Sequence, residues 1–264
     1  MKIGIIGCGN IGTELALFID DNPEHFKLTY LCDIDNTKII TLTALLRNNS
    51  PTVSPHSELI DRSEFIIESA GTEVVNKIFN SGTLDQHGKQ LLIMSTGGLI
   101  RNLDSLGTLK HTQIHLPSGA ISGLDAIKAV SGRIESLTLT TTKSAQGWED
   151  APYIIENNIQ LKQINNRKTI FRGTLKDAIE GFPKNINVAA TLFLASGFDD
   201  MKITIVVDPK SEFNVHEIEA TGSFGEIKTT TQNTPSKNPK TSYLAVLSAM
   251  SVLKNCTSNV KMGH

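Results

Sequence analysis

The sequence has little of what several classes of protein require. Its 264 residues include only three cysteines, and their spacing does not match that of a metal site. No apolar run approaches the ~18 residues of a membrane span, and no signal-peptide pattern opens the chain. The net charge is −2 without a basic block, so neither nucleic acid nor a membrane is an expected partner. We expect a cytoplasmic protein with reduced cysteines and no metal.

The first twelve residues, MKIGIIGCGNIG, have the order strand, glycine turn, helix. Gly7 would make the tight turn, Gly9 would let the backbone approach a pyrophosphate, and Gly12 would let the helix pack closely on the strand. The helix N-terminus would offer N–H groups and a positive dipole end to the phosphates. The residues of this loop predicted to bind the cofactor are Gly7, Gly9, Asn10, Ile11 and Gly12.

A second apolar run, residues 28–32, ends at Asp33, about 20 residues after the last glycine of the loop. An acid at this position can accept hydrogen bonds from the ribose hydroxyls and repels a 2′-phosphate. No lysine or arginine stands directly beside Asp33, so we predict NAD as cofactor, with NADP as the alternative. The competing interpretation is a glycine turn in an α/β protein that binds no nucleotide.

Three further apolar segments, residues 63–69, 91–94 and 113–116, alternate with helix-forming segments. This alternation predicts an N-terminal Rossmann domain, with a doubly wound parallel sheet. Each segment leads into a turn of small residues, at the strand ends where such sheets bind ligands.

The pattern changes after residue 122. Residues 136–143, SLTLTTTK, alternate as in a half-buried strand. Further strands are expected at residues 168–172, 202–207, 214–221 and 226–230. We predict a second α/β domain with a mixed or antiparallel sheet over residues 123–235. Residues 1–122 and 236–264 would form the first domain, to which an apolar helix at residues 241–254 would return.

Polar residues of the second half leave two interpretations open. His216 lies in a predicted strand and is either a structural residue or an acid–base catalyst, since the histidine pKa lies near neutrality. Asn187 either binds the nicotinamide amide or a substrate carboxylate, or caps a helix. Lys240 stands where the last helix begins and either binds an anion there or belongs to ordinary capping chemistry.

Several longer motifs carry a resemblance to a known family. They are GIIGCGNIG at 4–12, LPSGAISGLDAI at 116–127, TTTK at 140–143, FPKNINVAATLFLA at 182–195, NVHEIEATGSFGEI at 214–227 and NPKTSYLAVLSAM at 238–250. In their order and spacing the chain resembles the L-aspartate dehydrogenases. That family oxidises L-aspartate with NAD or NADP to iminoaspartate, and so to oxaloacetate and ammonia.

The resemblance implies roles for particular residues. His216 takes the position of the family's catalytic histidine, and Ala120 and Asn187 take positions that contact NAD. The second sheet would pack in a homodimer, and the product iminoaspartate could feed NAD biosynthesis. The turns at residues 69–72 and 96–98 depart from the family pattern, which leaves the details of cofactor and substrate binding open.

The two carboxylates of L-aspartate need cationic or N–H partners, and the sequence does not choose among Lys143, Arg172 and Lys240. Two other functions stay open. One is a two-domain reductase of the homoserine dehydrogenase or dihydrodipicolinate reductase type. The other is a protein that senses NAD without catalysis.

Overall fold

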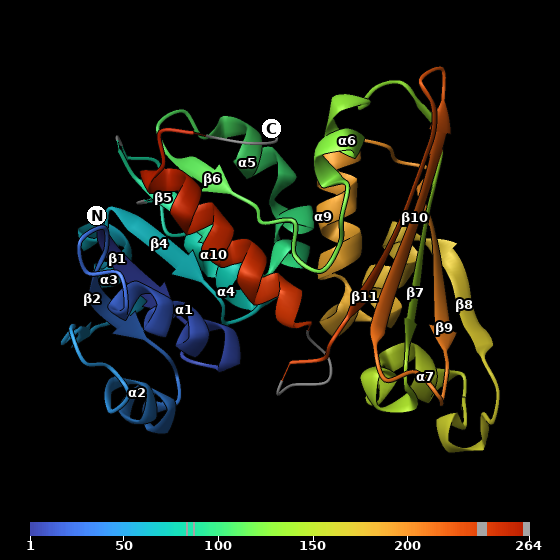
Figure 1. The fold of residues 1–264 in the computed structure, drawn as a ribbon, viewed down its shortest axis with the longest axis horizontal. Helices are drawn as coiled ribbons and strands as arrows, with labels where there is room; N and C mark the ends of the chain where they lie inside the picture. The colour runs from blue at the N-terminus through green and yellow to red at the C-terminus, as the bar shows by residue number, and fades with distance from the viewer. Residues whose placement is uncertain (83, 87, 237–241, 261–264) are drawn as a thin grey trace. The chain divides into compact units, whose positions relative to one another are not determined.

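The structure is a computed structural model that describes residues 1–82, 84–86, 88–236 and 242–260. The chain forms two compact units. The first comprises residues 1–117 and 246–260, and the second comprises residues 118–245. The labels in Figure 1 are used for their helices and strands.

The first unit contains a six-stranded parallel sheet with the order β3-β2-β1-β4-β5-β6. Its strands are β1 (Lys2–Ile6), β2 (Lys27–Cys32), β3 (Thr52–Val53), β4 (Phe65–Glu68), β5 (Gln90–Ile93) and β6 (Gln113–His115). All of β4 and four of the five residues of β1 are buried, which explains their continuous apolar sequences. The predicted doubly wound sheet is confirmed, and its strand order reverses between β1 and β4, where such sheets bind ligands.

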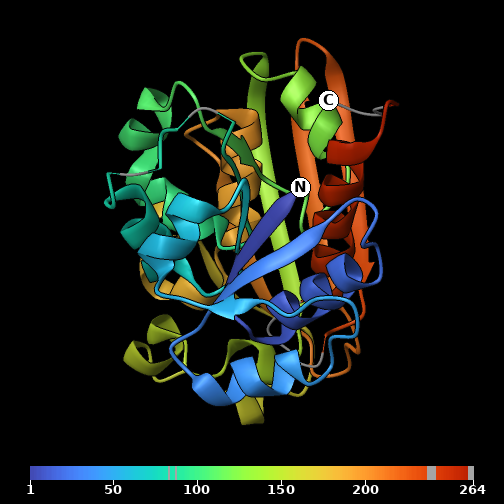
Figure 2. The same cartoon turned by 90° about the vertical axis from the view of Figure 1, so that its left-hand side faces the viewer.

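Helices cover both faces of this sheet. They are α1 (Asn10–Asp20), α2 (Asn36–Thr43), α3 (His56–Arg62), α4 (Thr72–Phe79), η1 (Thr96–Asn102), α5 (Leu103–Thr108) and α10 (Tyr243–Thr257). Figures 1 and 2 show α1 and α10 along one face, and α3 and α4 on the opposite face. Alternation of strands and helices in sequence therefore becomes a three-layered arrangement.

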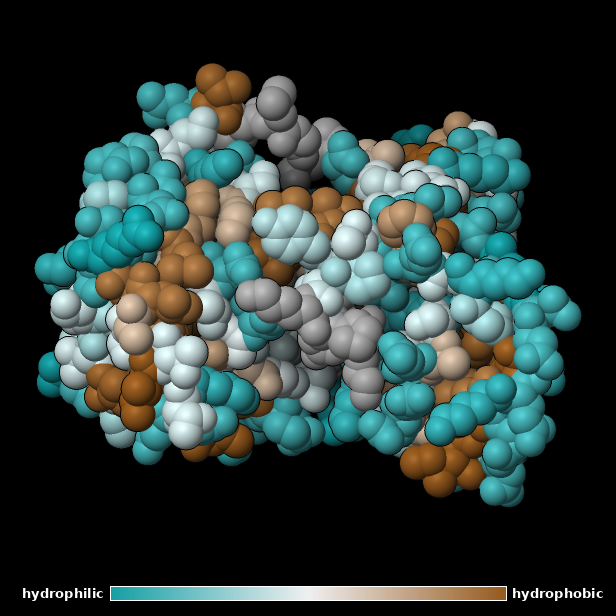
Figure 3. Space-filling view, turned by 60° about the horizontal axis from the view of Figure 1, so that its bottom comes forward, coloured by the Kyte–Doolittle hydropathy of each residue, from teal (hydrophilic) through white to brown (hydrophobic). Residues whose placement is uncertain are grey.

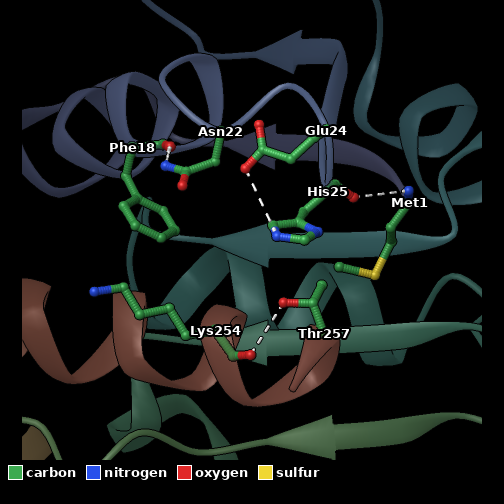
Figure 4. A network of polar contacts seen from close by, with 7 residues as sticks. All are labelled: Met1, Phe18, Asn22, Glu24, His25, Lys254 and Thr257. Carbon is green, nitrogen blue, oxygen red and sulfur yellow. Dashed lines mark hydrogen bonds and ion pairs between the residues drawn. The ribbon is translucent and has the colours of Figure 1, made fainter. Parts of the chain in front are cut away.

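The C-terminal helix α10 returns to the first unit, as predicted. Figure 4 shows Lys254 extending over the ring of Phe18 in α1, with its ammonium nitrogen 5.6 Å from the ring centroid. Val246, Ala249 and Leu253 of the same helix are buried. Apolar burial and this cation–π contact together hold the end of the chain on the Rossmann unit.

The second unit contains a five-stranded mixed sheet with the order β11-β10-β7-β9-β8. Its strands are β7 (Ile134–Lys143), β8 (Lys168–Thr174), β9 (Lys202–Val207), β10 (Asn214–Gly222) and β11 (Gly225–Asn233). β7 and β9 are parallel, and the other neighbours are antiparallel. The helices are α6 (Leu124–Ala129), η2 (Ala145–Trp148), α7 (Pro152–Glu156), η3 (Leu161–Gln163), α8 (Leu175–Gly181), η4 (Pro183–Asn185) and α9 (Asn187–Ser196). The predicted mixed sheet is confirmed.

One face of this second sheet is buried and the other is more exposed. Along β10, Asn214, His216, Ile218 and Ala220 are buried, whereas the residues between them are half-buried or exposed. Successive side chains of a strand point to opposite faces. His216 therefore shares the buried face with apolar residues.

On the face drawn in Figure 3, hydrophilic residues surround separate hydrophobic patches. None of the helices in the described ranges is both long and apolar enough to cross a membrane. Those ranges also contain no group of three or more histidine, cysteine, aspartate or glutamate side chains placed to hold a metal ion. Buried polar side chains do occur at strand ends, among them Glu68 at the end of β4 and Lys143 at the end of β7.

Candidate active site

The glycine loop between β1 and α1 has three glycines with different reasons for their presence. Gly7 has φ +101°, a conformation that favours glycine. A Cβ on Gly12 would lie 1.9 Å from the carbonyl oxygen of Gly7, whereas a Cβ on Gly9 would meet nothing within 4 Å. Packing therefore requires Gly7 and Gly12, but the protein itself leaves Gly9 unrestricted. The open space at Gly9 fits the close approach of a pyrophosphate.

Asp33 lies directly after β2 and its carboxylate is held by backbone donors. Oδ2 accepts from the N–H of Cys8 at 2.7 Å, and Oδ1 accepts from the N–H of Asp35 at 2.9 Å. A carboxylate has about four acceptor positions, so both oxygens can also accept from ribose hydroxyls. Burial, followed by the charge of Asp33, raises the pKa of Cys8 to about 12. The thiol in the glycine loop is therefore uncharged and would not repel a bound anion. Together these features fit a dinucleotide.

Two glycine substitutions separate folding from cofactor binding. Gly9→Ala should fold as the wild type does, yet weaken NADH binding about tenfold or more, because its methyl group occupies the open space. Gly12→Ala should lower the melting temperature because of the collision with Gly7. Thermal unfolding and titration with NADH measure the two effects. Unchanged NADH affinity in Gly9→Ala would contradict the assignment of the loop.

His216 in β10 lies opposite Thr141 in β7. Its Nδ1 is 3.0 Å from the Thr141 hydroxyl, and the side chain is buried. Burial, and then the positive charge of Lys143, lower the pKa of His216 to about 3. The imidazole is therefore neutral at physiological pH, with one ring nitrogen as a donor and the other as an acceptor.

Lys143 is the last residue of β7. Its side chain lies on the same face of the sheet as that of Thr141, which stands two residues before it. Lys143 is 5 % exposed, and its Nζ donates to Oδ1 of Asn185 at 2.9 Å and lies 5.1 Å from the centroid of the Trp148 ring. A Cβ on Gly147 would lie 2.9 Å from the Lys143 side chain, so that side chain is closely packed. The result is a positioned cation beside a neutral imidazole.

Three other residues were predicted for the site: Ala120, Asn187 and Lys240. Ala120 is buried, and its carbonyl oxygen accepts from Nδ2 of Asn233 at 2.9 Å. Asn187 is exposed and begins α9, two residues after Asn185. Lys240 lies outside the described residues.

Arg172 does not join His216. It lies in the edge strand β8, where it is exposed and pairs with Thr204 of β9. Thr204 pairs with Thr140 of β7, and Thr140 pairs with Glu217 of β10. Residues opposite one another share a face and successive residues alternate, so Arg172 is on the face of the sheet away from His216.

The low pKa of His216 predicts a loss of stability in acid. Below the ordinary histidine pKa of about 6.5, the unfolded chain binds a proton that folded His216 does not bind until about pH 3. Within this window the free energy of unfolding should fall by up to ~1.4 kcal/mol for each pH unit of acidification. Urea unfolding of His216→Asn should depend less steeply on pH than that of the wild type. Equal slopes would contradict a buried neutral imidazole.

The sequence alone did not identify three residues that contact His216 or Lys143, namely Thr141, Trp148 and Asn185. For Thr141 a signal existed, because the alternation in TTTK places it on the face of Lys143. Asn185 lies in the same polar turn as Asn187, but nothing local distinguishes it. Its partner Lys143 is 42 residues away in sequence, so only the folded chain identifies the contact.

Comparison with known proteins identifies the family. A family model described as "Aspartate dehydrogenase, C-terminal" matches residues 125–256. An L-aspartate dehydrogenase of Methanosarcina barkeri is 38% identical over 271 residues, which cover 100% of this chain and 99% of the relative. The chain belongs to the aspartate dehydrogenase family. The resemblance seen in the sequence, and the assignment to an oxidoreductase family, are thereby confirmed.

Solved structures agree with the aspartate dehydrogenase fold. The aspartate dehydrogenase of Thermotoga maritima has a TM-score of 0.72 at 23% identity, covering 100% of this chain and 99% of that one. A scyllo-inositol dehydrogenase of Lactobacillus casei, solved with bound NAD(H) and scyllo-inositol, has a TM-score of 0.56 at 13% identity, covering 100% and 91%. At these identities the likeness concerns the fold alone.

Proposed function

We propose that this chain oxidises L-aspartate with NAD to iminoaspartate, which water converts to oxaloacetate and ammonia. The full-length similarity to proteins named L-aspartate dehydrogenase carries the proposal. The neutral His216 beside the cationic Lys143 supports it, because the reaction needs a proton acceptor and a partner for carboxylates. In balance, aspartate and NAD⁺ give iminoaspartate, NADH and a proton, and one water then releases ammonia.

The glycine loop and Asp33 would hold the dinucleotide, and the family positions Ala120 and Asn187 would contact it. NAD, when bound, supplies the acceptor for the hydride from the substrate Cα. Gly9 leaves room for the pyrophosphate, Asn10 and Ile11 would offer backbone N–H groups at the start of α1, and the Asp33 carboxylate would accept from the ribose. In this proposal the protein orients the acceptor, and orientation accounts for much of the rate.

His216 would act in proton transfer. Its neutral imidazole can accept a proton from water as that water attacks the imine carbon, and can return the proton to the departing nitrogen. The Thr141 hydroxyl bonded to Nδ1 would fix the orientation of the ring. Lys143 would bind one substrate carboxylate through a charge-assisted hydrogen bond. Burial is the larger cause of the low pKa of His216, and a carboxylate bound to Lys143 would offset the second cause, the charge of Lys143.

A substrate panel tests the proposal against its alternatives. NADH formation should require L-aspartate and be absent with D-aspartate, L-glutamate and homoserine, and NADH should be consumed by oxaloacetate with ammonia. Activity with homoserine alone would indicate the reductase class instead. Binding of NADH without turnover of any substrate would indicate a sensor.

Asp33 should control the choice between NAD and NADP. Asp33→Ala removes the ribose acceptor and the charge that repels a 2′-phosphate, so we expect the ratio of kcat/KM for NAD to that for NADP to fall roughly tenfold or more. Asp35 is the N-cap residue of α2, and its side chain accepts from the N–H of Thr37. Asp35→Ala is therefore a nearby control that removes the same charge. An equal change of the ratio in both variants would contradict a specific role for Asp33.

We further propose a cytoplasmic homodimer that supplies iminoaspartate for NAD biosynthesis. Residues 1–122 and 236–264 would serve as the cofactor domain, and residues 123–235 as the substrate and dimerisation domain. The exposed face of the second sheet would form the contact between the two copies. Light scattering of the purified protein tests the dimer, and a monomer at working concentration would contradict it.

A further inference from the structure

A buried carboxylate, Glu68, lies at the end of β4 and takes no part in the chemistry proposed above. It is 0 % exposed. Its Oε1 accepts from the N–H of Ala70 at 2.8 Å, the N–H of Gly71 at 2.8 Å and the hydroxyl of Ser95 at 2.9 Å, and its Oε2 accepts from the N–H of Ser95 at 3.0 Å. Burial raises the pKa of Glu68, and these hydrogen bonds oppose the rise.

These bonds join the turns that follow two neighbouring strands. Ala70 and Gly71 lead from β4 into α4, and Ser95 leads from β5 into η1. The adjacent Ser69 extends the connection to β1, because its hydroxyl donates to the carbonyl oxygen of Gly7 at 2.8 Å. We call Glu68, Ser69 and Ser95 the strand-end clasp. It ties the ends of β1, β4 and β5 along the edge where dinucleotide-binding sheets hold their ligand.

The turn held by the clasp presents its backbone to open space. Gly71 has φ +136°, and a Cβ there would meet nothing within 4 Å. Gly9 in the glycine loop has the same open surroundings. Thus Glu68 fixes a turn whose outer side the protein does not fill, at the strand next to the glycine loop.

We propose that Glu68 is a positioning residue that shapes the β4 and β5 turns for the nicotinamide half of the cofactor. The inference rests on the proposed use of NAD. In that proposal the adenylate half is held at the ends of β2 and β1, so the turns after β4 and β5 come next along the same edge. A carboxylate suits the task because it only accepts hydrogen bonds, and all four groups facing it donate.

Glu68→Gln tests the proposal with almost no change of shape. Whichever way the amide is turned, its NH₂ group faces an N–H donor that then lacks its acceptor. The dissociation constant of NADH should rise about tenfold or more. That of AMP, which contains only the adenylate half, should stay within about twofold of the wild type. The KM for NAD should rise likewise.

Glu64→Gln is the matched control. Glu64 accepts from the N–H of Lys2 at 2.8 Å, so it also joins β1 to the β4 segment, but at the other end of the strands. Its replacement removes the same charge and should alter the affinity for neither nucleotide. Ser95→Ala removes only the hydroxyl that donates to Glu68. It should weaken NADH but not AMP binding, and it decides the matter if Glu68→Gln does not fold.

Equal weakening of AMP and NADH by the clasp variants, or no weakening of either, would overturn the role of Glu68. A wild-type protein that binds AMP but not NADH would instead overturn the proposed cofactor use. The two failures are therefore distinguishable in one set of titrations.

Discussion

His216→Asn is expected to lower kcat about 100-fold or more while NADH affinity stays within about twofold of the wild type. Asparagine retains a polar side chain in the buried position but cannot exchange a proton near neutral pH. The glycine loop and Asp33, which would bind the cofactor, belong to the other compact unit and are not altered. Steady-state kinetics with L-aspartate and a fluorescence titration with NADH measure the two quantities.

Thr141→Val is expected to lower kcat in the same way as His216→Asn, but by a smaller factor. It keeps the imidazole but removes the hydroxyl 3.0 Å from Nδ1, so kcat should fall less than in His216→Asn. His25→Asn serves as control, since His25 is exposed and lies in the other unit. Turnover of His216→Asn within about tenfold of the wild type would exclude the acid–base role.

Lys143→Met is expected to raise the KM for L-aspartate roughly 10- to 100-fold, through loss of a charge-assisted hydrogen bond to a carboxylate. Methionine preserves much of the apolar stem that lies close to Gly147. A second result should accompany the first. Removal of the positive charge should raise the pKa of His216, because Lys143 is one cause of its depression. Titration of the imidazole by NMR detects this change.

Arg172→Met provides the matched control for Lys143→Met. It removes a cation from the same sheet, but Arg172 points from the opposite face. The KM for L-aspartate should therefore be unchanged. A raised KM in Arg172→Met together with a normal KM in Lys143→Met would reverse the proposed assignment of the carboxylate partner.

Much of the fold could be predicted because its signals are local. The glycine spacing in residues 7–12 follows a short apolar strand and opens a helix, and all three elements form as expected. Alternation in SLTLTTTK correctly indicates a strand, β7, whose residues 136–141 alternate between more exposed and buried positions. Two-residue β3 gave no signal, since two residues are too few to show any alternation.

The site was less accessible from sequence because its contacts join distant segments. His216 meets Thr141 only through the register of β10 against β7. Arg172 and Lys143 were equivalent as cations in the sequence, and the pairing of β8 with β9, with its irregularity between Thr169 and Phe171, places Arg172 on the other face. The four donors of Glu68 come from two turns, so no spacing in the sequence marked this residue.

Transfer of deuterium from L-[2-²H]aspartate to NAD tests the central claim most directly. The proposed reaction moves the hydrogen on Cα to the cofactor, so mass spectrometry should find one deuterium in each NADH formed. His216→Asn should give the same labelled product far more slowly. Unlabelled NADH, or no NADH from L-aspartate at all, would contradict the proposed function.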